Sequence, residues 1–483
     1  MSTFGTYNIA YSGLYVSQAK LATVTTNLAN VNTEGASRVR AASADAVSVN
    51  SDGSTTSSGV SVASITRARN TLLDSSYRSE NSNTTYYSIK SGNLTYMDEI
   101  LNEFGSTEDD EGLQGLVSDF FDSWEELSSD PGSSECRDSA VESASSLLSA
   151  LQELDSKLQG LQSDAYSGVV DGIDALNNYA AQVADLNGAI TQAEAGGVEA
   201  SYLRDQRDQL LDEMSSLTNI TVTETDAGFQ VYVGGVAIVN GDKSYDLTVD
   251  GSGTEDDPIK ITSENFNCTV NISSGSIAAY LEDADQSGYS DTEASYSADA
   301  TSSITNMRQA LNDLVTTLAG KINSLLTSGY DLNGDAGVAL FTAIDSSQPL
   351  SITNMQINPE ILSDSNKLAA SDTAGEDGNN VVAKSIASLA SSDIYTFDGS
   401  SMDIYDFYAA VVSWLGTEGD KASSSYDTHT TLLESIDSER KSVSSISMDE
   451  EMSKMVIYQE AYNASAQVLS TIDSLLGDLM DAV

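Results

Sequence analysis

The sequence predicts a mainly α-helical protein with a small antiparallel β insert. Apolar residues recur at alternating steps of three and four near both ends and through the middle of the chain, which is the spacing of packed helices. None of the 4 prolines falls between residues 132 and 257, so no proline interrupts a helix there. After residue 218 the apolar residues alternate with polar ones, which is typical of strands. We therefore expect N- and C-terminal helices that pair as a coiled-coil arm, a core bundle of long helices and an outer β domain.

The composition excludes several classes of partner. The 483 residues include 21 Lys and Arg against 73 Asp and Glu, a net charge of −52. This charge repels nucleic-acid phosphates and anionic membrane surfaces, so we expect no nucleic acid and no membrane as partners. No stretch approaches the roughly 18 apolar residues that a transmembrane helix needs. No basic segment precedes an apolar run near residue 1, so the sequence predicts no cleavable secretory signal.

The scarcity of histidine and cysteine limits the chemistry. His429 is the only histidine, and Cys136 and Cys268 are the only cysteines. They cannot supply a disulfide framework, a thiolate zinc site or most His-dependent active sites. We expect no enzyme, no catalytic residue, no metal and no cofactor. We also expect His429 to be exposed on a helix and Cys268 to be a buried thiol that does not pair with Cys136, which lies in another predicted domain.

Each end of the chain carries one helix with a candidate assembly seam. The first helix is predicted to stop at Gly35, and its apolar seam contains Leu14, Leu21, Val24, Leu28 and Val31. The last helix is predicted to start at a capping box made by Ser447 and Glu450. Its seam contains Met455, Tyr458, Tyr462, Leu469, Ile472, Leu476 and Leu479.

Charge favours the pairing of the two ends. Residues 1–40 carry three basic side chains against one acidic, a net charge of +2, and residues 443–483 carry seven acidic against one basic, a net charge of −6. We expect the five N-terminal seam residues to contact Leu469, Ile472, Leu476 and Leu479. Both seams are narrow and include polar residues, so a lone pair would bury little surface. We therefore expect the ends to become ordered when many copies assemble.

The middle of the chain is predicted to hold long helices. Two of their apolar seams are Leu147, Leu151, Leu154, Leu158 and Leu161, and Met307, Leu311, Leu314, Leu318, Ile322 and Leu325. Arg204 and Asp208 stand four residues apart, so we expect them to pair on one helix face. Such a pair adds a few tenths of a kcal/mol to a helix and implies no chemistry.

The β insert is marked by Asn240-Gly241, a strong short hairpin signal. Phe266, Cys268, Val270 and Ile272 alternate with other residues, so we expect them on one face of a strand. We divide the chain into three domains: residues 1–50 plus 443–483 as a terminal helical assembly domain, 51–218 plus 300–442 as a helical bundle core, and 219–299 as the inserted β domain.

One segment imitates a metal site. Asp331, Asn333 and Asp335 match the first three ligands of a calcium-binding loop. Ala336 stands where that loop needs Gly, and Thr342 stands where it needs Glu. We therefore expect a turn without a metal.

Both ends of the chain resemble a known family. The N-terminal residues Ser12-Gly13-Leu14, Gln18-Ala19 and Asn27-Leu28-Ala29-Asn30, with the C-terminal Met448-Asp449-Glu450-Glu451 and Tyr458-Gln459-Glu460-Ala461-Tyr462, resemble the terminal signatures of flagellar rod, hook and hook-associated proteins. Three inner segments resemble the hook-associated members: Gly112-Leu113 with Trp124 and Arg137, Leu203 to Leu211, and Gly329 to Gly334.

The resemblance implies a structural subunit of the extracellular flagellum at the junction between hook and filament. It implies export by the flagellar type III apparatus, self-association in a ring or helical layer, and contact with the hook protein and a second junction protein. It also implies a cytoplasmic export chaperone on the C-terminal helix. Two alternatives stay open at this point. The chain could be another axial protein, such as a hook protein or flagellin-like subunit, or a secreted enzyme with its chemistry in residues 220–300.

Overall fold

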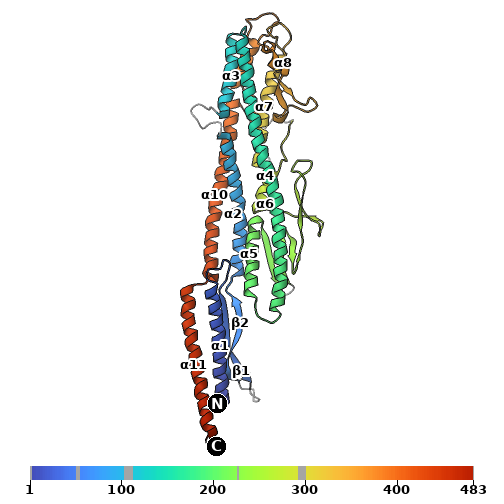
Figure 1. The fold of residues 1–483 in the computed structure, drawn as a ribbon. Helices are drawn as coiled ribbons and strands as arrows, with labels where there is room; N and C mark the ends of the chain where they lie inside the picture. Colours follow the sequence, from blue (N-terminus) through green and yellow to red (C-terminus); the bar gives the residue numbers. More distant parts are fainter. Residues whose placement is uncertain (1–2, 50–54, 103–111, 226–227, 292–300, 482–483) are drawn as a thin grey trace.

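The structure is a computed structural model that describes residues 3–49, 55–102, 112–225, 228–291 and 301–481. The molecule is elongated, and both chain ends lie at one extremity (Figure 1). The α-helices are α1 (Thr3–Ala29), α2 (Thr71–Asn102), α3 (Gly112–Ser129), α4 (Ser134–Glu194), α5 (Ser201–Leu217), α6 (Ser276–Ala284), α7 (Ser303–Thr327), α8 (Pro359–Ser363), α9 (Val381–Ala387), α10 (Ile404–Ser444) and α11 (Met448–Asp481). Long helices with small antiparallel sheets confirm the predicted fold class.

The terminal arm consists of α1, α11 and a hairpin of β1 (Val39–Val49) and β2 (Thr55–Arg67). α1 packs against α11 on one side and against the hairpin on the other (Figure 1). The spacing of apolar residues did not predict this hairpin, because its pairing shifts register after Ala42 and again after Ala46 and so breaks their alternation. A domain boundary at residue 50 would separate the paired strands, so we propose to place it after Arg67.

The body is built around α4, whose 61 residues span about 90 Å at roughly 1.5 Å per residue. The side chain of Ser133 caps this helix by accepting a hydrogen bond from the backbone N–H of Cys136 at 3.2 Å. α3 and α7 pack against α4 toward the far end, and α10 runs beside α2. The two predicted seams in α4 and α7 belong to one large apolar core, as expected, although Leu161 and Leu325 are only partly buried against it.

The β insert lies beside α4, α5 and α6 and shares a second apolar core with them. One sheet has the order β3-β4-β5-β6 and the other has the order β7-β8-β9. Their strands are β3 (Ile220–Thr225), β4 (Gly228–Val233), β5 (Val236–Asn240), β6 (Lys243–Ser244), β7 (Leu247–Asp250), β8 (Lys260–Ser263) and β9 (Cys268–Thr269). The hairpin predicted at Asn240-Gly241 is confirmed: Asn240 pairs with Lys243, and Gly241 has a φ of 63°.

The strand expected around Cys268 is mostly absent from the structure. Residues 264–267 form a turn in which Asn267 has a φ of 48°, so only Cys268 and Thr269 remain in β9. Phe266 is exposed as a result, and Cys268 is half-buried, whereas a buried core thiol was expected. The thiols of Cys136 and Cys268 are both free.

The far end of the body carries two short sheets that the sequence analysis did not predict. β10 (Phe341–Ala343) pairs with β11 (Met355–Ile357), and β12 (Tyr395–Phe397) pairs with β13 (Ser400–Met402). Each strand is only three residues long, too short for a periodicity signal. Both sheets contribute side chains to the large core.

Candidate assembly interface

Three contacts fix the register of α1 against α11. A Cβ placed on Gly13 would lie 3.1 Å from Oγ of Ser465. Nζ of Lys20 lies 5.6 Å from the centre of the Tyr458 ring, and Nδ2 of Asn27 donates to Oε2 of Glu451 at 2.9 Å. Successive contacts are seven residues apart on both helices. The two helices therefore pair antiparallel with a heptad repeat.

The structure distributes the predicted seam residues over the whole arm. Val24 and Ile472 are buried. The others whose side chains are described are half-buried: Leu14, Leu21, Leu28, Val31, Met455, Tyr458, Tyr462, Leu469 and Leu476. The side chain of Leu479 lies outside the described residues.

The register corrects the expected partners of these residues. Val24 and Leu28 flank Asn27, so they lie beside the first turns of α11 near Glu451. Leu469 is roughly 27 Å further along α11 at about 1.5 Å per residue. It therefore cannot contact Val24 or Leu28 of the same chain. The prediction failed because apolar spacing identifies the face of a helix and not its register.

Polar contacts at the base of the arm were not predicted. Glu451 is 1% exposed and accepts hydrogen bonds from Asn27 and, at 2.9 Å, from Nζ of Lys454. Nη1 of Arg38 pairs with Glu450 at 2.9 Å. The hydrogen bond from Lys454 lowers the pKa of Glu450. The seven-residue spacing of Gly13, Lys20 and Asn27 is visible in the sequence. It was overlooked because the expected seams were built from the spacing of apolar residues alone.

Both helices of the arm carry exposed large apolar side chains. Tyr7, Tyr11 and Tyr15 follow one another at steps of four on α1, and Tyr15 is 60% exposed. Along α11 the exposed large apolar residues are Met448, Met452, Val456, Ile457, Val468 and Leu475. The arm thus pairs its two helices and leaves several large apolar side chains of both helices uncovered, which favours an interaction with other molecules.

The contacts of helix α5 contradict the expected ion pair between Arg204 and Asp208. Arg204 donates from Nε to Glu194 at 2.6 Å, and its Nη1 bonds Glu224 at 3.0 Å. Asp208 instead accepts from Arg67, at 2.7 Å. Arg204 and Asp208 therefore do not pair, because each has a partner on another element that a helix-based rule cannot foresee.

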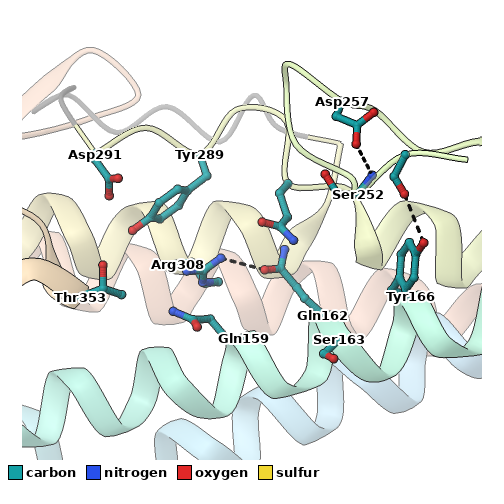
Figure 2. A pocket seen from close by; sticks show the side chains of 12 residues that line it. Gln159, Gln162, Ser163, Tyr166, Ser252, Asp257, Tyr289, Asp291, Arg308 and Thr353 are labelled. Atoms are coloured by element: carbon teal, nitrogen blue, oxygen red, sulfur yellow. Dashed lines mark hydrogen bonds between the residues drawn. The ribbon is translucent and has the colours of Figure 1, made fainter. Parts of the chain in front are cut away.

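A polar cavity of about 920 Å³ lies between α4, the β insert and α7 (Figure 2). Arg308 is its buried cation, with Nε 2.8 Å from Asp155 and Nη1 2.9 Å from the amide oxygen of Gln162. Its guanidinium lies 4.5 Å from the centre of the Tyr289 ring, and burial raises the pKa of that tyrosine. The buried cation of this lining is therefore already paired with Asp155.

The candidate chemical residues outside the arm have structural partners. His429 is half-buried, not exposed as expected: it bonds Glu80 and stacks on Tyr87 at 5.1 Å, because α10 packs along α2. Oδ1 of Asp331 accepts from the backbone N–H groups of Asn333 and Asp335 at 2.9 and 2.8 Å and so closes a turn. Within the described ranges, no cluster of three or more His, Cys, Asp or Glu residues is placed to hold a metal ion.

Among the described residues, no helix combines the length and the apolar character needed to cross a bilayer.

Two family profiles match the chain. The profile described as the flagellar hook-associated protein FlgK helical domain matches residues 94–341. The profile described as the flagellar basal body rod FlgEFG protein C-terminal matches residues 441–482, which cover α11. The first match covers the end of α2, the helices α3 to α7 and the β insert, and the second covers α11 of the arm.

Relatives and a solved structure agree with these matches. Flagellar hook-associated protein 1 of Bacillus subtilis (strain 168) is 27% identical over an alignment that covers 100% of this chain and 99% of the relative. The protein of the same name from Escherichia coli (strain K12) is 23% identical over an alignment that covers 98% of this chain and 99% of the relative. The flagellar hook junction protein FlgK of Burkholderia pseudomallei shares the fold, with a TM-score of 0.61 at 14% identity over 77% of this chain and 100% of that one.

These findings support a structural, hook-associated role in the flagellum. The FlgK profile covers more than half of the sequence, and its match lies where the inner segments resemble hook-associated proteins. The chain belongs to the family of the flagellar hook-associated protein FlgK.

Proposed function

We propose that this chain is a non-catalytic subunit of the junction between the flagellar hook and filament, and that it assembles through α1 and α11. The observation that carries the proposal is the row of exposed apolar side chains on both helices of the arm, among them Tyr11, Tyr15 and Ile457. Burying such surface against neighbouring subunits releases about 25 cal/mol per Å². The arm is therefore the part of the subunit whose packing is completed by other subunits.

The same surface suggests the partners. Further copies of the chain would cover it in a ring or helical layer, with the hook protein and a second junction protein as neighbours along the axis. Before export through the flagellar type III apparatus, a cytoplasmic chaperone on α11 would cover the same side chains. The assembled protein would belong to the extracellular flagellum.

The seam residues divide into two proposed roles. Val24 and Ile472 are buried and hold the arm of one subunit together. The half-buried residues, such as Leu14, Leu21 and Leu469, have one side free for a neighbouring subunit. We therefore propose that the interface comprises the predicted seam together with the exposed residues beside it.

The test is Ile457→Asp, placed at a side chain that is 62% exposed. The purified subunit should keep its circular dichroism and melting temperature, because the new charge faces water in the monomer. In cells that lack the native chain, the variant should fail to retain filaments, because assembly would bury an unpaired charge. Asn463→Asp adds the same charge at an exposed polar position of α11 and should support filaments. Normal filaments with Ile457→Asp would refute the assembly surface.

Another axial role, as a hook or filament subunit, is the second candidate. The rod-type profile over residues 441–482 would fit such proteins as well. Copy number separates the two, because a junction layer needs about one helical turn of subunits and a hook or filament needs many. Immunogold labelling of isolated flagella should place this chain in one narrow band. Label along the whole hook or filament would favour the alternative.

A further inference from the structure

The arm is attached to the body without an apolar core. The large core and the core of the β insert contain no described residue of α1, β1, β2 or α11. The chain crosses between arm and body in two places, at residues 68–70 and 445–447. The direction of the arm must therefore be set by the polar contacts near these crossings.

Arg67, the last residue of β2, makes the densest of these contacts. Its Nη1 lies 2.8 Å from Asp205 and 2.7 Å from Asp208 on α5, and its Nε lies 3.2 Å from Glu199, just before α5. The Arg67 side chain is 10% exposed, and those of Asp205 and Asp208 are each 12% exposed. These three carboxylates form a socket on the body that receives one cation from the arm.

The same socket also receives the other end of the hairpin. Ser37, which precedes β1, donates its backbone N–H to Asp205 at 2.9 Å and bonds that carboxylate again through its hydroxyl. The backbone N–H of Arg38 donates to the carbonyl of Ser444 at the end of α10, at 2.8 Å. One carboxylate thus connects the start and the end of the hairpin to α5.

Cations of the body keep the socket in place. Asp208 is bonded by Arg69 at 3.1 Å and by Arg78 at 3.2 Å, and Asp212 is bonded by Arg440 of α10 at 2.6 Å. Burial opposes ionisation of Asp208, but the surrounding arginines outweigh it and lower the pKa of this carboxyl. When Arg67 is absent, Arg69 and Arg78 still bond Asp208.

We propose that Arg67 and its acceptors Glu199, Asp205 and Asp208 form an ionic joint that sets the direction of the arm relative to the body. Ion pairs at this depth are only weakly screened by salt, so the joint holds at physiological ionic strength. It rests on the proposed function, because the arm is the part that assembles. An arm held in one direction loses less freedom when it meets its neighbours, which favours assembly.

The test measures the direction of the arm in the full-length monomer. Spin labels at Tyr15→Cys on α1 and Leu432→Cys on α10, both exposed positions, report the distance between arm and body. The two native thiols are removed as Cys136→Ser and Cys268→Ser. Pulsed electron resonance should give a narrow distance distribution, because the joint allows one arm direction.

Arg67→Gln removes the cation and should widen this distribution at least twofold. Arg67→Lys keeps the charge but loses the forked geometry of the guanidinium. The width of its distance distribution should therefore fall between that of the protein with Arg67 and that of Arg67→Gln. Arg40→Gln is the matched control, since Arg40 is exposed on the neighbouring strand, and its distribution should stay narrow. An unchanged width for Arg67→Gln would overturn the joint, as would equal widening by Arg40→Gln.

Two further measurements keep the result interpretable. The melting temperature of the body should not change in Arg67→Gln, because Arg69 and Arg78 still bond Asp208. If the body also melts earlier, the widening reflects lost stability and the joint is refuted. Filament retention by Ile457→Asp tests the assembly surface separately, so either proposal can fail without the other.

Discussion

Asn27 of α1 donates a hydrogen bond from Nδ2 to Oε2 of Glu451 in α11 at 2.9 Å, although the two residues are 424 positions apart. The same side chain exchanges two hydrogen bonds with the backbone of Val39, each 2.9 Å long. One amide therefore connects α1, α11 and the start of the hairpin. Glu451, whose carboxylate accepts one of these hydrogen bonds, is 1% exposed.

The first prediction concerns this amide. Asn27→Ala leaves Glu451 with Lys454 as its remaining side-chain partner and frees the backbone of Val39, so it should destabilise the arm by about 2–4 kcal/mol. Hydrogen exchange at the start of α11 should accelerate accordingly. Asn8→Ala, at an exposed position of the same helix, should have little effect. Equal acceleration by both variants would contradict the role of Asn27.

The second prediction compares two glycines of α4. A Cβ on Gly172 would lie 2.7 Å from Cγ1 of Ile277 on α6, whereas a Cβ on Gly160 meets nothing within 4 Å. Gly172→Ala should therefore destabilise the body by about 1–3 kcal/mol through overpacking. Gly160→Ala should stabilise it by about 0.5–1 kcal/mol, because alanine favours the helix. Urea unfolding midpoints give both values, and shifts of the same sign would disprove the packing argument.

The third prediction concerns pH. Burial raises the pKa of Asp283 from 3.8 to about 7, although Asn93 donates a hydrogen bond to it at 2.6 Å. Between these two values the unfolded chain has released this proton and the folded chain still holds it, so the contribution of Asp283 to stability falls as pH rises. The total loss is about 4 kcal/mol and is complete above the folded pKa.

Asp283→Asn cannot ionise and should lack this loss. The difference in unfolding free energy between wild type and variant should therefore change between pH 4 and pH 7 and be constant above about pH 8. Asp171→Asn, at an exposed position of α4, is the control and should show no such change. A difference that does not vary with pH would show that Asp283 titrates normally.

The fourth prediction concerns Arg137, which is 2% exposed. Its guanidinium donates to the carbonyl oxygens of Pro131 at 2.5 Å, Ser133 at 3.2 Å and Leu368 at 3.1 Å. Arg137→Met removes these hydrogen bonds and should cost about 3 kcal/mol. Arg137→Lys should recover little, because an ammonium cannot reproduce the fork. Thermal unfolding measures the stability of both variants. Lys157→Met, at a partly exposed position of α4, is the control. Full stability of Arg137→Lys would show that only the charge matters.

Much of the fold could be predicted because its signals are local. The spacing of Leu147, Leu151 and Leu154 marks the buried face of α4 without knowledge of its partner. The hairpin at Asn240-Gly241 was predictable because a glycine readily adopts the positive φ that its turn needs. The β1–β2 hairpin was missed because its two register shifts break the alternation on which strand prediction depends.

The sequence by itself determined that both ends are helices with an apolar face, that the body is a helical bundle and that an alternating insert interrupts it. These features follow from the spacing of side chains along one helix or strand. The tertiary structure alone decided the register of α1 on α11 and the acceptors of Arg67. Those acceptors lie 132 to 141 positions away in the chain. With 73 acidic residues competing for 21 basic ones, charge pattern cannot select them, because only folding brings particular pairs within bonding distance.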